Sequence, residues 1–389
     1  MNVVVHYKKG NFLPIAERGI YDQIKNLREF RSVVYCHGIQ NPEAFPFDMV
    51  RSLDREKGLA VRAINSVYFS MFDFFPYFGA CLSKNRPAVI HSHFGPSGYF
   101  FLWLKRYFSL PMVTAFYGYD LSKLPVLHPR WKKRYAKLFR YGELFLVEGS
   151  AMKRRLIELG CPENKIILQH IGVDIDVIKF SPRRPARDGA VRVLVCGRFR
   201  EKKGISYAIE ALGLAKKDNP GLNMKMTVIG DSSGCRLEEL EKQKIFDRIK
   251  KYGLEKDVVM LGEKPYSFFL EEIYRHHIFL SPSVTAADGD TEGGVPVSLI
   301  EASASGMPVL STVHCDIPEV VLNNRSGYLV PERDAAALAE KLLLLAGNPQ
   351  NWERMGAAGR AHIEQEYDSK KQAKKLEEIY NEAINRIAF

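Results

Sequence analysis

The chain has 389 residues, 46% of them hydrophobic and 26% charged, a composition that argues against disorder, collagen-like repeats or a coiled coil and allows two or three domains. No apolar run reaches the roughly 20 residues that span a bilayer. The best candidate, residues 67–82, has the size of a buried helix, but it carries Asp73 and is broken at Pro76. Residues 1–6 predict a strand and lack the features of a signal peptide.

The excess positive charge lies in the first half of the chain. The whole chain carries +11, and residues 1–190 hold 29 Lys and Arg against 16 Asp and Glu, a net of +13. A basic half predicts an anionic surface or partner. The six cysteines are scattered singly, without a C-x-x-C pair or a cluster at zinc spacing, which favours a reducing, cytoplasmic setting.

Short apolar runs alternate with helical patterns in both halves, which predicts parallel sheets covered by helices. The expected strands of the first half are residues 3–6, 32–36, 88–91, 112–116 and 144–147. Those of the second half are residues 192–196, 225–229, 258–261, 278–281, 309–311 and 327–330. Helices are expected between them, and residues 180–189 form the expected linker because Pro and Gly punctuate them. The sequence therefore predicts an α/β protein with two doubly wound domains and a cleft at the carboxyl ends of both sheets.

A basic helix is expected over residues 128–145. Its cations recur at helical spacing, and aromatic residues lie on another face. The cations are Arg130, Lys133, Arg134, Lys137 and Arg140. Such a helix can lie on an anionic membrane surface, with the aromatic stretch 68–78 near the same face. The alternative is a core helix with a solvated basic face. No recognised nucleic-acid motif accompanies the charge.

The segment GRFREKKG, residues 197–204, directly follows the first strand of the second half. Arg198 lies at the strand end and Lys203 just before the next helix, so both can converge on one anion. Two charge-assisted donors, each worth roughly 1.5–3 kcal/mol, can hold a diphosphate and stabilise it as it leaves. The alternative is that some of the basic side chains in this segment are solvated surface.

The strongest signal lies in residues 281–312. Gly293 and Gly294 open a helix expected near residues 297–305, and a glycine turn before a helix N-terminus suits phosphate. Glu301 lies inside that helix among apolar residues, where its carboxylate can accept hydrogen bonds from paired hydroxyls such as those of a ribose. The alternative is that Glu301 complements the helix dipole, a contribution of about 0.3–1 kcal/mol.

These motifs together resemble family 4 of the retaining glycosyltransferases. The resemblance is carried by GRFREKKG, LGEKP (261–265) and DGDTEGGVPVSLIEASASGMPVLST (288–312), and in the first half by IHSHFGPSG (90–98), TAFYGYDLS (114–122) and IGVDIDVIKF (171–180). It implies the GT-B fold, with two Rossmann-like doubly wound domains facing each other across a cleft. Residues 1–182 would bind the acceptor and residues 183–366 the nucleotide sugar, and a last helix, 367–389, would cross back to the first domain.

The resemblance also assigns roles in the second domain. Arg198 and Lys203 would grip the donor diphosphate, Glu301 the ribose, and Glu292 the transferred sugar. The turn 263–265, with Lys264, would lie beside the nucleobase. The glycine turn and helix start would hold phosphate and sugar through Gly293, Gly294, Val295, Pro296 and Val297. Glu292 and Glu301 are separated by eight residues, one more than is usual in the family, which makes Glu301 the firmer assignment.

The acceptor-side motifs of the first half point to five residues, which are His91, His93, Tyr117, Asp120 and Asp174. Tyr117 stands where many relatives have histidine, which argues against a general base there. For both histidines, a structural role and a functional one stay open. Asp120 can orient the acceptor hydroxyl or cap the helix that follows.

The implied function is transfer of a sugar, with retained configuration, from a UDP- or GDP-sugar to a lipid-linked or other saccharide in bacterial surface polysaccharide synthesis. The alternative is a non-catalytic relative that binds a nucleotide sugar. Asp288-Gly289-Asp290 matches the metal-binding D-x-D of the other large glycosyltransferase fold, but we interpret it as loop polarity. We therefore expect no cofactor, no essential metal and no nucleic-acid partner. The expected location is cytoplasmic, with an anionic membrane surface as a further partner.

Overall fold

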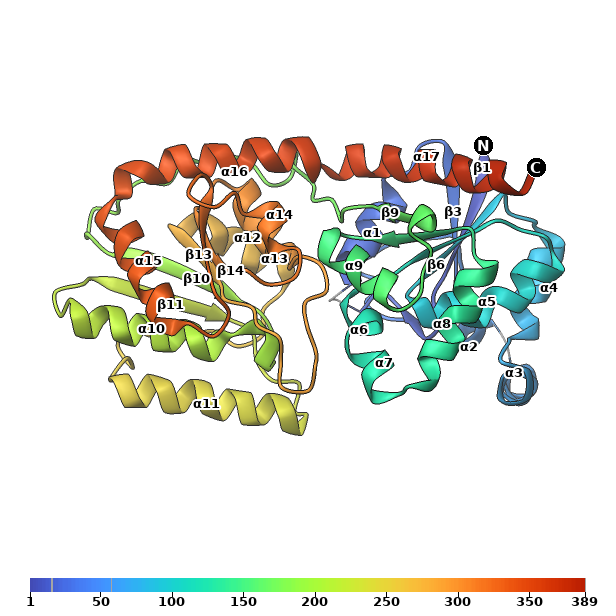
Figure 1. The fold of residues 1–389 in the computed structure, drawn as a ribbon, viewed down its shortest axis with the longest axis horizontal. Coiled ribbons are helices and arrows are strands. Elements are labelled where there is room, and N and C mark those ends of the chain that lie inside the picture. Colours follow the sequence, from blue (N-terminus) through green and yellow to red (C-terminus); the bar gives the residue numbers. More distant parts are fainter. Residues whose placement is uncertain (15–16, 57, 389) are drawn as a thin grey trace. The chain divides into compact units, whose positions relative to one another are not determined.

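The computed structural model describes residues 1–14, 17–56 and 58–388, and the chain forms two compact units (Figure 1). The first unit comprises Met1–Val173 together with Ser369–Phe389, and the second comprises Asp174–Asp368. The chain thus passes from the first unit to the second at residues 173–174, whereas the sequence placed this boundary at 182–183. Within the described ranges, no helix combines the length and apolar character needed to cross a bilayer.

The first unit contains a parallel sheet in the order β5-β3-β1-β6-β7-β8-β9. Its strands are β1 (Asn2–Tyr7), β3 (Phe30–Cys36), β5 (Val50–Ser52), β6 (Val89–His93), β7 (Met112–Ala115), β8 (Leu144–Val147) and β9 (Ile166–Leu168). The short strands β2 (Asn11–Phe12) and β4 (Gly38–Ile39) pair separately. All five strands expected in this half are present. The short edge strands β5 and β9 were not expected.

The side chains of each strand alternate between two helical layers. Tyr7 on β1 packs with Phe78 and Phe101 from α4 (Pro76–Lys84) and α5 (Gly95–Tyr107). Val4, on the other face of β1, lies in a core with Tyr380 of α17 (Ser369–Ala388). The α17 helix therefore belongs to the core of the first unit, although almost 200 residues of the second unit precede it in the chain.

The remaining helices of the first unit surround this sheet. They are α1 (Arg18–Lys25), α2 (Leu53–Glu56), α3 (Leu59–Phe72), α6 (Gly118–Leu121), α7 (Lys123–Leu127), α8 (Arg130–Tyr141) and α9 (Ser150–Glu158). The predicted basic helix is confirmed as α8, whose inner face buries Trp131 and Tyr135.

The break that the sequence places in residues 67–82, with Asp73 inside the stretch and Pro76 interrupting it, is confirmed. Asp73 ends α3 in a left-handed conformation, with φ of 59°, and Pro76 begins α4. Proline disfavours helical geometry at the residue before it, so Phe75 is extended and the chain breaks there. Asn65 is the buried residue of α3, and the helix exposes apolar side chains instead of burying them.

The second unit contains a parallel sheet in the order β12-β11-β10-β13-β14-β15. Its strands are β10 (Val191–Cys196), β11 (Met224–Ile229), β12 (Val258–Met260), β13 (Ile278–Ser281), β14 (Val309–Thr312) and β15 (Gly327–Val330), so all six expected strands are present. The strand order reverses between β10 and β13. In open parallel sheets, ligands bind at the carboxyl ends of the strands at this point of reversal.

Helices cover the second sheet in two groups. The α10 (Ile205–Asp218), α11 (Arg236–Tyr252) and α15 (Ala335–Gly347) helices pack together, and α13 (Val297–Ala304) packs against α16 (Trp352–Glu366) (Figure 1). The α12 (Tyr266–Arg275) and α14 (Ile317–Val320) helices complete the unit. Ile209 and Leu212 of α10 are fully buried in the same core as residues of β10 and β11.

Candidate active site

Two loops meet where the strand order of the second unit reverses. One follows β10 and carries GRFREKKG, and the other follows β13 and leads to α13. Gly204, at the end of the first loop, has φ of +64°, and a Cβ there would lie 1.8 Å from the carbonyl oxygen of Pro282 in the second. Only glycine permits this approach. The structure therefore joins the two motifs that the sequence singled out.

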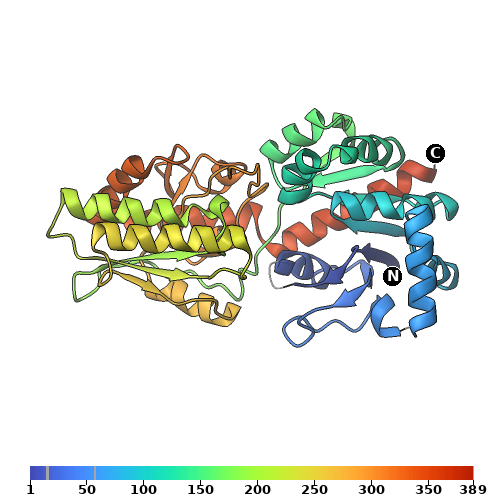
Figure 2. The same ribbon diagram turned by 90° about the horizontal axis from the view of Figure 1, so that it is seen from below.

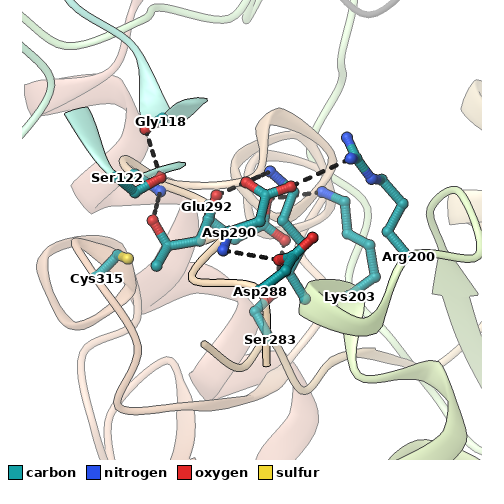
Figure 3. A network of polar contacts seen from close by, with 12 residues as sticks. Gly118, Ser122, Arg200, Lys203, Ser283, Asp288, Asp290, Glu292 and Cys315 are labelled. Carbon is teal, nitrogen blue, oxygen red and sulfur yellow. Dashed lines mark hydrogen bonds and ion pairs between the residues drawn. The ribbon is translucent and has the colours of Figure 1, made fainter. Parts of the chain in front are cut away.

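A buried ion pair links these loops (Figure 3). The ammonium of Lys203 lies 2.9 Å from Oε2 of Glu292, and the hydroxyl of Ser283 donates to Oε1 at 3.0 Å. Burial alone would raise the pKa of Glu292, but Lys203 and Lys202 outweigh it and hold that pKa below its usual value. Glu292 is thus an ionised carboxylate, and its predicted contact with the transferred sugar stays a prediction.

Arg198 is held much more loosely than Lys203. Its side chain is 54% exposed, and Oε1 of Glu238 lies 4.0 Å from its guanidinium. The neighbouring Arg200 lies closer to carboxylates, at 3.6 Å from Glu238 and 3.4 Å from Asp290 (Figure 3). Arg198 therefore presents an exposed cation at the carboxyl end of β10, as expected for a residue that grips an anionic ligand.

The Asp288-Gly289-Asp290 segment is organised by protein groups. Asp290 is buried, its carboxylate lies 3.2 Å from the ammonium of Lys202, and it also pairs with Arg200. Its backbone N–H donates to Oδ1 of Asp288 at 3.0 Å. These contacts support the interpretation of the segment as loop polarity.

Glu301 lies inside α13 and is 5% exposed. The hydroxyl of Tyr266 donates to its Oε1 at 2.7 Å, and Tyr266 directly follows the turn 263–265 that was expected beside the nucleobase. Burial and the charge of Glu301 raise the pKa of the Cys196 thiol to about 12, whereas Lys203 opposes the rise. Glu301 lies beyond the first turn of α13, where the helix dipole has little effect, so the dipole alternative is disfavoured.

The start of α13 has the features of an anion-binding turn. Gly293 has φ of +77°, and its N–H donates to Oγ1 of Thr291 at 3.2 Å. Pro296 is the N-cap residue and makes no side-chain cap, so the N–H groups of the first turn receive no acceptor from it. Lys264, by contrast, is exposed, and its ammonium lies 5.7 Å from the ring centre of Phe268.

His314 and its partner Glu332 also lie at this edge of the sheet, and the sequence did not single them out. The backbone N–H of Glu292 donates to Nε2 of His314 at 3.2 Å, and Nδ1 of His314 lies 2.6 Å from Oε1 of Glu332. His314 follows β14, the neighbour of β13, so its position just after a strand was the available signal. The Glu332 carboxylate orients the imidazole, which in turn positions the Glu292 loop.

The acceptor-side residues of the first unit form a separate buried network. Nδ1 of His93 is hydrogen-bonded to the Tyr117 hydroxyl at 2.9 Å, and Nδ1 of His91 to the Tyr380 hydroxyl at 2.7 Å. Nδ1 of His6, which the sequence analysis did not select, lies 3.1 Å from Nε2 of His93. Burial lowers the pKa of His91 to about 3 and that of His93 well below its usual value. Both imidazoles are therefore neutral, which supports the structural alternative.

Asp120 acts as a cap in the structure. Its Oδ1 accepts from the N–H of Tyr117 at 2.8 Å, and its Oδ2 accepts from the N–H of Gly95 at 2.7 Å. Burial raises its pKa to about 7 although both hydrogen bonds lower it. Of the two roles left open, capping is the one that these contacts support.

Asp174 is the first residue of the second unit, and its Oδ1 accepts from the N–H groups of Asp176 and Val177. Its acceptor-side role stays a prediction.

His6, His91 and His93 offer nitrogen atoms that all lie within 4.8 Å of one another, and in the described residues they are the one group with the composition of a metal site. The expectation of no essential metal also stays a prediction.

Comparison with known proteins agrees with this geometry. Residues 16–177 match the family model described as glycosyltransferase family 4, and residues 177–362 match the one described as glycosyl transferases group 1. The chain belongs to the family 4 glycosyltransferases. The resemblance inferred from the motifs is thereby confirmed for both halves.

Two curated relatives of this chain are named for bacterial surface polysaccharides. WcaL of Escherichia coli strain K12, a colanic acid biosynthesis glycosyltransferase by name, is 38% identical over 268 residues, which cover 68% of this chain and 63% of WcaL. AmsK of Erwinia amylovora, an amylovoran biosynthesis glycosyltransferase, is also 38% identical, with 69% and 63% covered. The matched region thus spans less than two thirds of the length of either relative.

Two solved structures share the fold. Anabaena HepE, crystallised with UDP, superposes with a TM-score of 0.78 at 17% identity, covering 98% of this chain and 100% of HepE. The lipopolysaccharide outer core galactosyltransferase WaaB superposes with a TM-score of 0.69 at 16% identity, with 99% of both chains covered. The predicted GT-B class, with two Rossmann-like domains, is confirmed.

Removal of the Tyr266 hydroxyl tests the Glu301 site. In Tyr266→Phe, Glu301 loses a hydrogen bond that orients its carboxylate. A bond to a charged group is worth about 1.5–3 kcal/mol, so we expect the KM for the donor to rise by roughly tenfold or more while kcat changes little. Steady-state kinetics with varied donor measures this split. A fall in kcat at unchanged KM would mean that Tyr266 and Glu301 act on the reaction and not on donor binding.

Proposed function

We propose that this chain is a retaining glycosyltransferase that moves a sugar from a UDP- or GDP-sugar to a hydroxyl of a lipid-linked saccharide in the synthesis of a bacterial surface polysaccharide. The observation that carries the proposal is the joining of the GRFREKKG loop to the glycine turn before α13, at the point where strand order reverses. Such a position suits a nucleoside diphosphate. The names of WcaL and AmsK support the polysaccharide class, and the HepE complexes with UDP and UDP-glucose support the donor class.

In the proposed reaction, the bond between the anomeric carbon and the diphosphate breaks, and a bond to the acceptor oxygen forms. The acceptor proton leaves with the diphosphate. Negative charge develops on the diphosphate as the bond breaks, and catalysis requires that this charge be stabilised. The exposed guanidinium of Arg198, the ammonium of Lys203 and the start of α13 would stabilise that charge. Glu301, oriented by Tyr266, would accept hydrogen bonds from the ribose hydroxyls.

Glu292 provides a specific reason to keep the non-catalytic alternative. Both of its oxygens are engaged, one by Lys203 and one by Ser283, and the extra residue before Glu301 alters the family spacing. In a relative that only binds a nucleotide sugar, this ion pair would serve stability alone. The two functions differ in whether any donor is turned over.

A donor screen followed by a turnover assay tests the proposal. Thermal unfolding with a panel of UDP- and GDP-sugars should reveal one donor class, because a ligand that binds the folded state stabilises it. The selected radiolabelled donor is then incubated with extracted lipid-linked saccharides, with and without EDTA. Transfer in both conditions, with the anomeric configuration kept, supports the proposal and the expectation of no essential metal. Tight nucleotide binding with neither transfer nor hydrolysis would establish the non-catalytic alternative.

A further inference from the structure

Helix α3 exposes an apolar face to solvent. Ile64, Val67 and Met71 are 52%, 56% and 68% exposed, and their spacing of three and four residues places them on one stripe of the helix. Arg62 is the one charged residue of α3. A surface helix of a globular protein normally turns its apolar stripe to the core, and a large exposed apolar patch marks an interaction site.

An aromatic ridge, defined as Tyr68, Phe74, Trp103 and Tyr107, continues this face. The ring centres of Phe74 and Trp103 lie 4.3 Å apart in a stacked arrangement, and those of Trp103 and Tyr107 lie 5.3 Å apart. Tyr68 reaches Phe74 at 5.9 Å, so the ridge runs from α3 to the end of α5. Trp103 and Tyr107 are 49% and 70% exposed. Amphipathic rings of this kind favour the boundary between water and lipid.

The chain around this face is strongly cationic. Residues 59–141 contain 12 Lys and Arg against two carboxylates, Asp73 and the buried Asp120. The guanidinium of Arg134 on α8 lies 3.5 Å from Asp73, the residue that ends α3, so the cationic helix and the apolar helix are held together. The exposed cations of α8 are Arg130, Lys132, Lys133, Lys137 and Arg140.

An apolar stripe bordered by cations is the pattern of an element that lies in the surface of an anionic bilayer. Each Lys or Arg near such a surface adds about 1 kcal/mol of attraction. In both views of the ribbon, α3 lies at the outer edge of the first unit (Figures 1 and 2). The helix is held by its inner side, where the Asn65 side chain accepts from the N–H of Tyr77 at 3.0 Å.

We propose that α3 and the aromatic ridge insert into the headgroup–acyl boundary of an anionic bilayer, while the exposed cations of α8 contact the phosphates. The sequence predicts membrane contact by the basic helix α8, with the aromatic stretch 68–78 near the same face. The structure adds an apolar element that enters the lipid. The inference deepens the proposed function, because a lipid-linked acceptor lies in such a bilayer, but it rests on residues outside the donor site.

Vesicle binding by the full chain tests this inference. Phosphatidylcholine vesicles with phosphatidylglycerol should bind the protein and shift the emission of Trp103 to shorter wavelength, since Trp131 and Trp352 are already buried. Vesicles without phosphatidylglycerol should bind much less. The Ile64→Gln/Met71→Gln variant should lower the partition coefficient by about tenfold or more, because two inserted side chains become polar. The matched control is Phe246→Gln/Leu344→Gln, which changes exposed apolar residues of α11 and α15 and should bind like wild type.

Three outcomes would overturn the inference. The first is no binding of wild type to vesicles with phosphatidylglycerol, and the second is binding of the Ile64→Gln/Met71→Gln variant equal to that of wild type. The third is a dimeric wild type and a monomeric variant that bind these vesicles equally. The last would make this face an interface between copies of the chain. Thermal shift with UDP or GDP in the same variants separates the two proposals. Vesicle binding without turnover would contradict the proposed function alone, and turnover without vesicle binding would contradict this inference alone.

Discussion

Lys203→Ala is expected to abolish most turnover and also to destabilise the second unit. The substitution leaves Glu292 ionised and buried, at 6% side-chain exposure, without its 2.9 Å partner. Removing one partner of a buried pair costs about 3–5 kcal/mol. If Lys203 only bound the donor diphosphate, as the sequence predicts, the variant would lose turnover while its free energy of unfolding stayed nearly unchanged. The structure changes that expectation, because the same ammonium neutralises a buried carboxylate.

A double variant separates the two roles of Lys203. Lys203→Ala/Glu292→Gln removes the uncompensated charge, so chemical denaturation should show most of the lost free energy of unfolding restored. Turnover should stay low, because the cation that stabilises the diphosphate is still missing. Recovery of turnover in the double variant would instead show that Lys203 acts only by neutralising Glu292.

Acid sensitivity gives an independent check on the same pair. The pKa of Glu292 in the folded chain lies below its usual value of 4.5, because Lys203 and Lys202 stabilise the carboxylate, so folding favours the ionised form. The stability from this pair is therefore fully present above about pH 4.5 and is lost as the pH falls through the folded pKa. Wild type should lose this contribution on acidification, whereas the double variant should not.

Arg198→Ala is expected to reduce kcat by about 10²–10³ with no measurable loss of stability. The guanidinium is half exposed, and its 4.0 Å contact with Glu238 is the kind of surface pair that contributes about 0–1 kcal/mol. Removing one preorganised hydrogen-bond donor to a developing negative charge typically lowers kcat by about 10²–10³-fold. Steady-state kinetics and thermal unfolding of the same preparation measure both quantities.

Arg192→Ala is the matched control for Arg198. Arg192 lies on the same strand, β10, near its amino end, where it pairs with Asp188. The variant loses the same charge at the opposite edge of the sheet, so its turnover should equal that of wild type. Similar losses of rate in both variants would mean that net charge, and not the position at the strand end, supports catalysis.

The sequence determined the architecture and the sheet edge at which the two motifs assigned to the donor lie. Mostly apolar runs of three to five residues marked all eleven expected strands, because a strand buried on both faces needs a continuous apolar stretch. The position of GRFREKKG and of the glycine turn directly after strands placed both at one sheet edge. Both motifs are local patterns. Because the carboxyl ends of parallel strands lie at one edge of the sheet, the loops that follow them lie at that edge however the helices pack.

The tertiary structure alone decided which side chains meet. The partners Lys203 and Glu292 lie 89 residues apart, Tyr266 and Glu301 lie 35 apart, and His91 and Tyr380 lie 289 apart. No periodicity records such pairs, because they depend on how loops pack at the ends of strands. The same holds for the exposure of α3, which its sequence alone did not decide. Whether an apolar stripe is covered depends on the neighbours that the fold supplies, and in α3 Ile64, Val67 and Met71 are more than half exposed.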